Sequence, residues 1–206
     1  MRNWDNLVEK DTDNFKFRDF RNRFWQKKIL LLWFQRNHHH KWFQGYNPMS
    51  NDSSDTPYDY DHILPYSHLI AQGGSPRVYS DNEAMVRRFF AYRGWYVNSI
   101  GNFRVWPSWA NRSDQNDCHT KKLRLTKIES DSLSQELDLK SANDFMQASA
   151  INIEDKALWI KAGGSPRNWN EERRVNWQTA VENRVIFLYE IFYNSFDFEC
   201  WIRDQE

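Results

Sequence analysis

Apolar residues are plentiful in this chain, but they occur in short runs separated by charged and polar residues, and that pattern limits what the chain can fold into. Hydrophobic residues make up 40% of the 206 residues, yet the longest wholly apolar run covers only residues 29–34. A helix that spans a membrane needs roughly 20 apolar residues in succession. The sequence therefore excludes a membrane-spanning segment and predicts one globular domain with a single core.

Aromatic residues are the outlier of the composition. The chain contains 11 Trp, 9 Tyr and 14 Phe, and charged residues make up 27%. This balance is typical of a folded domain, because disordered segments are poor in aromatic residues. We therefore expect most tryptophans to lie in the core. The alternative is that a few of them stack on unpaired nucleic-acid bases.

The cysteine content and the first residues of the sequence indicate the cellular compartment of the protein. Cys118 and Cys200 are too few for a disulfide framework and are not spaced like zinc ligands. The opening sequence MRNWDNLVEKDTD is acidic and lacks the apolar stretch of a secretory signal. We expect a cytoplasmic protein with reduced thiols and no membrane partner.

Positive charge is concentrated near the start of the chain, although the whole chain has a net charge of zero. Residues 16–41 contain eight Lys or Arg residues against one acidic residue, Asp19, and three successive histidines, 38–40, near the end of this segment. A local basic patch can contact nucleic acid even in a neutral protein. A solvated helix face would have the same composition, so the patch alone does not decide between the two.

Two short strands are predicted in the first two thirds of the chain. Residues 58–64 and 99–106 are rich in aromatic and β-branched residues, and Pro65 and Pro107 are expected to end them. The sequence GGSPR occurs twice, and we interpret both copies as junctions where one helix stops and another starts, not as a duplication.

Helices are predicted on both sides of these strands by the spacing of apolar residues. They are expected as one or two helices over 15–44, a helix over 75–94, a short helix over 108–116, a weakly helical stretch over 126–150 and a long helix over 176–195.

The residues best suited to chemistry lie at the ends of the two predicted strands. Asp61 and His62 are neighbours in the first strand, while Asn102 enters the second strand and Asn111 follows nine residues later on the short helix. Carboxylate and amide oxygens are ligands that Mg²⁺ or Mn²⁺ prefers. An imidazole can accept a proton from water near neutral pH. Because strand, strand and helix fold back on one another, we expect Asp61 and His62 to approach Asn111.

The sequences YDYDHILP at 58–65 and SIGNFRVWPSWANRSDQN at 99–116 resemble those of the HNH, or ββα-metal, endonucleases. The similarity is closest to the C-terminal nuclease domains of GmrSD-type modification-dependent restriction enzymes. The HNH domain of RNA-guided CRISPR nucleases is similar over the same residues. LLLWFQRN at 30–37 and the closing helix at 176–194 also resemble segments of the GmrSD relatives.

This resemblance implies a role for each residue of the motif. His62 would be the general base that activates water, and Asn102 would position the loop and orient His62. Asp61 and Asn111 would hold one Mg²⁺ or Mn²⁺ ion. Two further residues, Asp59 and Asn116, would support the site. Asn111 stands where many members of the superfamily have their last histidine, and an amide oxygen there favours the harder Mg²⁺ ion.

The implied activity is the hydrolysis of DNA phosphodiester bonds in restriction and antiviral defence. Arg104, Arg112, Lys121 and Lys122 would then contact DNA, although solvated surface positions would account for them equally well. Residues 66–99 separate the two halves of the motif and carry Arg87, Arg88 and Arg93, either as an insertion that contacts DNA or as scaffold. His119 is either an ordinary polar position or a further residue near the metal.

The fold predicted on this basis is α+β, with a ββα-metal core between N- and C-terminal helices. It is expected as one domain over 1–206, divided into a helical segment 1–45, a nuclease core 46–125 and a helical segment 126–206. In the GmrSD relatives a nucleotide-dependent domain precedes the nuclease, and the sequence contains no GxxxxGK[ST] loop.

We therefore expect either a nuclease domain cut from a larger enzyme or a protein that works with a separate nucleotide-dependent restriction subunit. A homodimer would explain the cutting of both DNA strands. The alternative function is a nuclease subunit, or an inactive HNH-like DNA-binding module, that depends on such a partner.

Overall fold

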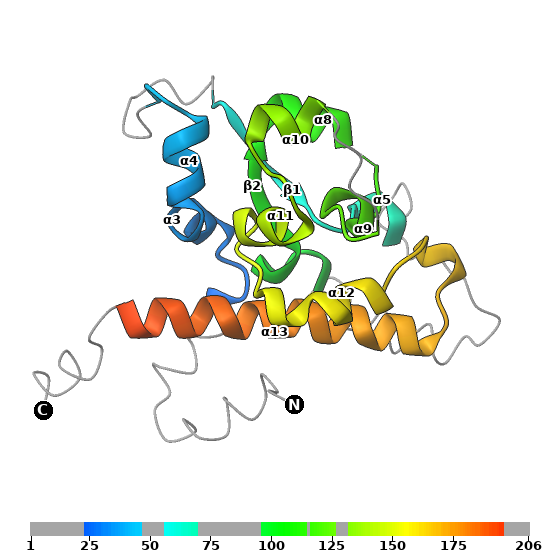
Figure 1. The fold of residues 1–206 in the computed structure, drawn as a ribbon. Coiled ribbons are helices and arrows are strands. Elements are labelled where there is room, and N and C mark those ends of the chain that lie inside the picture. Colours follow the sequence, from blue (N-terminus) through cyan, green and yellow to red (C-terminus); the bar gives the residue numbers. More distant parts are fainter. Residues whose placement is uncertain (1–22, 47–55, 70–95, 115, 127–131, 196–206) are drawn as a thin grey trace, which may run out of the picture.

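The computed structural model describes residues 23–46, 56–69, 96–114, 116–126 and 132–195. Helices surround one small antiparallel sheet, which confirms the α+β class (Figure 1). The predicted helix over 75–94, with Arg87, Arg88 and Arg93, lies outside the described residues.

The elements before and within the sheet region are η1 (Lys28–Leu30), α3 (Leu31–Phe34), α4 (Arg36–Trp42), β1 (Tyr58–His62), α5 (Tyr66–Leu69), η2 (Ile100–Asn102), β2 (Phe103–Pro107), α8 (Ser108–Asp114) and α9 (His119–Lys122). The later elements are α10 (Ser132–Leu137), α11 (Ala142–Ala148), η3 (Ile153–Asp155), α12 (Lys156–Lys161), η4 (Pro166–Asn168) and α13 (Glu171–Ser195). None of the described helices is both long enough and apolar enough to cross a membrane.

The two strands pair in antiparallel register, from Tyr58 opposite Pro107 to His62 opposite Phe103. α8 follows β2 directly and packs on both strands. The second strand starts later than predicted, because residues 100–102 form a 3₁₀ turn instead of extended chain. Pro107 is the last residue of β2, and not the residue that interrupts it.

The other edge of β2 is paired by a side chain instead of a third strand. The amide of Gln35, which follows α3, is buried, donates to the Val105 carbonyl at 3.0 Å and accepts from the Val105 N–H at 2.8 Å. The same amide nitrogen donates to the Ala148 carbonyl. Gln35 thus satisfies backbone groups of β2 that would otherwise be unpaired in the interior.

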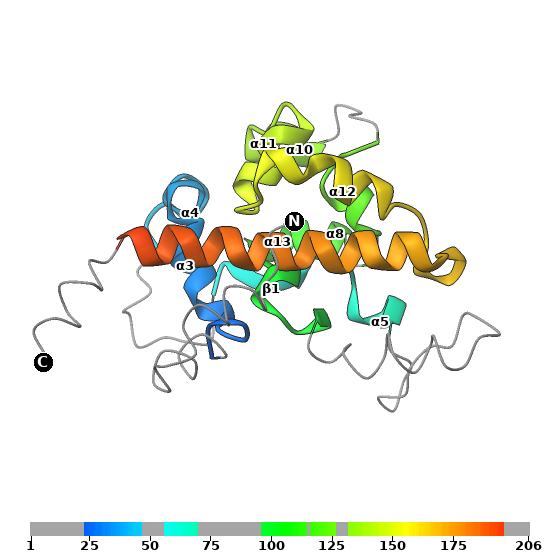
Figure 2. The same cartoon turned by 90° about the horizontal axis from the view of Figure 1, so that it is seen from below.

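The longest helix, α13, runs along one side of the molecule and packs on α12 and η2 (Figures 1 and 2). It begins at Glu171, five residues before the prediction, because the Asn170 side chain caps it by accepting from the Arg173 N–H at 3.0 Å. Its apolar residues join two of the three hydrophobic clusters of the core. Most described tryptophans are buried, as predicted: Trp25, Trp106, Trp159, Trp169 and Trp177. Trp109 is an exception, with 45% of its surface exposed.

Arg184, in the middle of α13, is fully buried and binds backbone carbonyls. Its guanidinium donates to the carbonyls of Ile100, Gly101, Phe103, Ser149 and Ala150. Burial lowers the pKa of Arg184 to about 9, which still leaves it charged at neutral pH. The side chain therefore fastens η2 and the end of α11 to α13.

Gly101 is required where η2 meets α13. A Cβ at this position would lie 2.5 Å from the Val181 carbonyl oxygen and 2.8 Å from methyl groups of Val181 and Val185. Real Cβ atoms essentially never approach backbone that closely. The glycine that precedes Asn102 in the sequence therefore lets the turn sit directly on the long helix.

We expect Arg184→Lys to lower the free energy of unfolding by roughly 3 kcal/mol, because one ammonium cannot satisfy five carbonyls and most would stay buried without a donor. Arg173→Lys, at an exposed position of the same helix, is the matched control and should change it by less than about 0.5 kcal/mol. Denaturant unfolding of both variants measures this, and equal effects would contradict the role given to Arg184.

His119 is fully buried, with its ring against Trp159 and Trp169. Its Nε2 is 3.0 Å from the Trp159 carbonyl oxygen. Burial lowers the pKa of His119 from 6.5 to about 4. The imidazole is therefore neutral in the folded protein at neutral pH and acts as a packing residue.

We expect this histidine to make folding sensitive to acid. Between pH 6.5 and about 4 the unfolded chain binds a proton that folded His119 does not, so stability is complete above this range and falls by up to about 1.4 kcal/mol per pH unit below 6.5. Unfolding measured at pH 7 and pH 5 should show a smaller drop for His119→Gln than for the wild type. The same drop in both proteins would assign the acid sensitivity to other groups.

Candidate functional site

An open pocket of about 300 Å³ lies where β1 ends. Its lining comes from β1, the turn that follows, α5, α8, α9 and the loop after α8: Tyr60, Asp61, His62, Pro65, Tyr66, Ser67, Asn111, Asn116 and Lys122. The structure therefore brings Asp61, His62 and Asn111 to one pocket, as the sequence predicted, although residues 61 and 111 are far apart in the chain.

Asn102 is fully buried and fixes the turn after His62. Its Oδ1 accepts from the Leu64 N–H at 2.9 Å, and its Nδ2 donates to the carbonyls of Leu64 and Val97 at 3.1 and 3.0 Å. The Asn102 carbonyl also accepts from the Ile63 N–H. An asparagine can make this set of bonds because its amide carries both a donor and an acceptor.

His62, the last residue of β1, is held from several sides. Its ring lies against Phe103, with centroids 4.1 Å apart, and Nε2 is 3.4 Å from Asn98 Oδ1. Burial lowers the pKa of His62 below 6.5, more than the nearby Asp61 raises it. A neutral imidazole at neutral pH has a free lone pair, which is the state that a general base needs.

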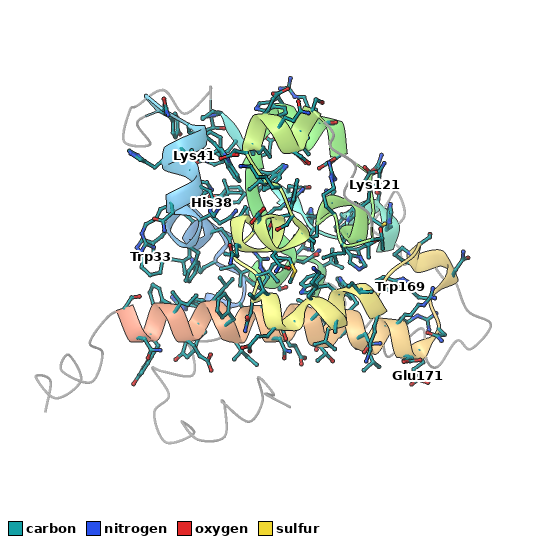
Figure 3. All side chains as sticks on the ribbon, in the orientation of Figure 1. Trp33, His38, Lys41, Lys121, Trp169 and Glu171 are labelled. Atoms are coloured by element: carbon teal, nitrogen blue, oxygen red, sulfur yellow. The ribbon has the colours of Figure 1, made fainter. Side chains whose placement is uncertain are left out.

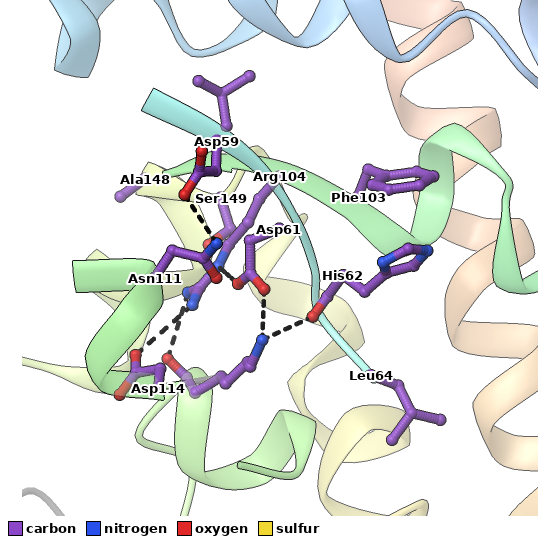
Figure 4. A network of polar contacts seen from close by, with 12 residues as sticks. Asp59, Asp61, His62, Leu64, Phe103, Arg104, Asn111, Asp114, Ala148 and Ser149 are labelled. Carbon is purple, nitrogen blue, oxygen red and sulfur yellow. Dashed lines mark hydrogen bonds and ion pairs between the residues drawn. The ribbon is translucent and has the colours of Figure 1, made fainter. Parts of the chain in front are cut away.

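Asp61 points to the other face of the strand, into a buried ionic cluster (Figure 4). One carboxylate oxygen accepts from Arg104 Nε at 2.8 Å, directly across the sheet, and the other accepts from Lys122 Nζ. Lys122 Nζ also donates to the His62 carbonyl at 2.8 Å. Both oxygens that would bind a metal are thus engaged by cationic side chains of the chain itself.

The cluster continues beyond Asp61 and has an excess of positive charge. Arg104 Nη2 and Arg124 Nη2 lie 3.6 and 3.5 Å from the Asp114 carboxylate. Burial raises the pKa of Asp114, against the effect of both guanidinium groups. With Asp61 and Lys122, the cluster holds three cations and two carboxylates, a formal net charge of +1.

Asn111 projects from α8 toward β1 and binds Asp59 (Figure 4). Its Nδ2 donates to Asp59 Oδ2 at 3.0 Å. Asp59 and Asp61 lie two positions apart in the strand and therefore share a face. This bond uses the amide nitrogen of Asn111, and not the oxygen that would bind a metal.

The four expected DNA contacts divide into two pairs. Arg104 and Lys122 are fully buried in the cluster, so neither faces solvent. This differs from the expectation, because Asp61 supplies a buried partner for both. Arg112 and Lys121 are exposed, as a contact with DNA would require. Lys121, which is labelled in Figure 3, belongs to α9 and forms an ion pair with Asp117.

Asn116 supports the pocket through the loop after α8. Its Oδ1 accepts from Ser67 Oγ at 3.2 Å, and its carbonyl oxygen lies 2.9 Å from His68 Nε2. These bonds join the loop to α5 on the opposite side of the pocket. Asn116 therefore supports the pocket by joining the loop after α8 to α5.

The donor set fits a hard divalent cation in its chemistry, because two carboxylates and one amide gather beside one pocket. Within the described part of the chain there is no group of three or more His, Cys, Asp or Glu side chains placed to hold a metal ion. In this structure both Asp61 oxygens accept from cationic side chains, Arg104 and Lys122. The site is therefore suited to a metal in composition, but its main carboxylate is held by internal cations.

Comparison with known proteins adds no assignment to this geometry: no family model, no curated protein and no solved structure matches the chain. Sequence reasoning missed Lys122 as the partner of Asp61 and Asn98 as the partner of His62. No local sequence signal marks either contact, because the partners are separated by 61 and 36 positions.

We expect Asn102→Ala to lower the free energy of unfolding by roughly 3 kcal/mol, because it leaves the Leu64 N–H and two carbonyls buried without partners. Asn143→Ala, which removes an exposed bond to Lys156, is the control. Chemical denaturation gives both values. A loss in Asn102→Ala no larger than in the control would show that the turn does not depend on Asn102.

Proposed function

We propose that this protein is a metal-dependent HNH endonuclease that hydrolyses DNA phosphodiester bonds, in restriction or antiviral defence against foreign or modified DNA. The observation that carries the proposal is the convergence of Asp61, His62 and Asn111 on one pocket, with buried Asn102 fixing the turn that follows His62. The order of strand, strand and helix also agrees with a ββα-metal core. The resemblance of YDYDHILP and SIGNFRVWPSWANRSDQN to this superfamily adds support.

His62 would act as the general base. Contacts with Phe103 and with the pocket residue Tyr66, and the bonds that Asn102 makes just after β1, hold the imidazole at the end of the strand, and its lowered pKa keeps it neutral. Water in the pocket could therefore transfer a proton to His62 while it attacks a phosphorus atom. General acid–base catalysis by a positioned side chain typically raises the reaction rate about 10²–10⁴-fold.

Asp61 and Asn111, with Asp59 beside them, are the residues that would hold Mg²⁺ or Mn²⁺. When bound, such an ion would neutralise the charge that builds up on the phosphate and on the leaving oxygen. Arg112 and Lys121 adjoin the pocket residues Asn111 and Lys122 in sequence and are exposed, so they are suited to contact the neighbouring phosphates.

We expect the purified chain to nick supercoiled plasmid DNA with Mg²⁺ or Mn²⁺ and not with EDTA. His62→Ala should reduce the rate at least about 100-fold through loss of the base, and Asn111→Ala should reduce it and shift the metal requirement. His40→Ala, at an exposed histidine outside the pocket, is the matched control and should cleave like the wild type.

Other results of this experiment would change the proposal in defined ways. Activity that survives His62→Ala but is lost in Asn111→Ala would move the base to another residue. Absence of cleavage under every condition, with DNA still retained in a gel-shift assay with EDTA, would reject the stand-alone enzyme.

A second function is favoured by one observation, the engagement of both Asp61 oxygens by Arg104 and Lys122. A site held in this way suits an HNH-like module that binds DNA, or a nuclease subunit that becomes active with a nucleotide-dependent partner. Metal-independent binding of DNA without cleavage would support the module. Cleavage that appears only after a partner is added would support the subunit.

A further inference from the structure

We propose that Lys122 is an exchangeable internal cation, which occupies Asp61 in the metal-free protein and must leave it before a divalent ion can bind. The proposal rests on the metal site of the proposed function and adds a means of regulating it. It gives Lys122 a role at the site that differs from a contact with DNA.

The position of the ammonium group is the first observation. Lys122 Nζ lies between an Asp61 carboxylate oxygen and the His62 carbonyl oxygen, and the residue lines the pocket although its side chain is fully buried. A carboxylate oxygen and a backbone carbonyl oxygen are the kinds of ligand that hard cations select. Lys122 therefore takes up the contacts that a metal ion at Asp61 would use.

The charge of the cluster is the second observation. With Asp61 and Asp114 as its two carboxylates, the cluster has a net charge of +1 before any metal is added. Asp59, on the same face of the strand, would at most balance this charge. A divalent ion placed at Asp61 would therefore meet Lys122 and Arg104 on the same two oxygens, at close range, where little water screens the repulsion. Binding at Asp61 is therefore strongly disfavoured unless one cation leaves.

Lys122, and not Arg104, is the cation that can leave. Arg104 is held by Asp61, by Asp114, by the Lys122 carbonyl and by the face of Trp106, 3.8 Å from its guanidinium carbon. Lys122 borders the pocket, and its unbranched four-carbon stem can swing into that space. Once displaced, its ammonium would face the pocket, where a phosphate of the substrate would lie.

The experiment is a titration of the full chain with Mn²⁺, followed by electron paramagnetic resonance, for the wild type, Lys122→Met and Lys121→Met. Lys122→Met keeps the length of the side chain but removes the competing charge. It should bind Mn²⁺ roughly tenfold more tightly or better. Lys121→Met removes the exposed neighbouring charge, which pairs with Asp117, and should bind like the wild type.

Equal Mn²⁺ affinity in the wild type and Lys122→Met, or weaker binding in the variant, would overturn the proposal. So would equal gains in Lys122→Met and Lys121→Met, because these would report general surface charge. Asp61→Asn in the Lys122→Met background should cancel the gain, and a gain that persists there would show that the ion binds elsewhere.

A second measurement uses the wild type and does not depend on a variant that folds. Reaction with an amine-specific reagent, read by mass spectrometry, should leave Lys122 protected without metal and modify it at saturating Mn²⁺, while exposed Lys121 reacts in both conditions. Protection of Lys122 that is unchanged by bound Mn²⁺ would overturn the exchange. Plasmid nicking tests the two proposals separately. If the expected Mn²⁺ results are obtained but the chain does not nick plasmid DNA, the proposed nuclease activity is rejected and the exchange of Lys122 for a metal ion is retained.

Discussion

The arrangement of the site depends on a guanidinium group that is buried among backbone carbonyls. Arg184 binds carbonyls on both sides of Asn102 and at the end of α11, and every acceptor recorded for it in the described residues is a carbonyl. A buried charge of this kind costs much solvation and is tolerated only with many well-placed partners. Because Gly101 lets η2 approach α13 closely, the helix and the turn form one rigid support.

Two adjacent residues of β1 serve opposite sides of the sheet because side chains alternate along a strand. His62 lies against Phe103 and stays neutral, whereas Asp61 enters a cluster rich in cations. Burial also lowers the pKa of Lys122, in spite of its ion pair with Asp61. The pair thus combines a neutral imidazole with a carboxylate whose charge is compensated by cationic side chains of the chain itself.

Much of the fold could be predicted from local pattern, and much of the site from spacing. The sheet, α8 and the long helix follow from alternation, turn residues and helical periodicity. The approach of Asp61 and His62 to Asn111 follows from the way that strand, strand and helix fold back on one another. The start of β2 could not be predicted, because bonds from Arg184, more than 80 positions away, select a turn. The burial of Arg104 and Lys122 could not be predicted either, because their partner, Asp61, is remote from both in the sequence.

The pairing of Gln35 with β2 protects one edge of the small sheet. A two-stranded sheet is marginal in water and exposes two edges that can recruit strands from other molecules. The Gln35 amide imitates one residue of a third strand, because it offers a donor and an acceptor to Val105 at the spacing of a peptide group. Gln35, directly after α3, therefore occupies the backbone N–H and carbonyl of Val105, so a strand from another molecule cannot pair with β2 at this residue.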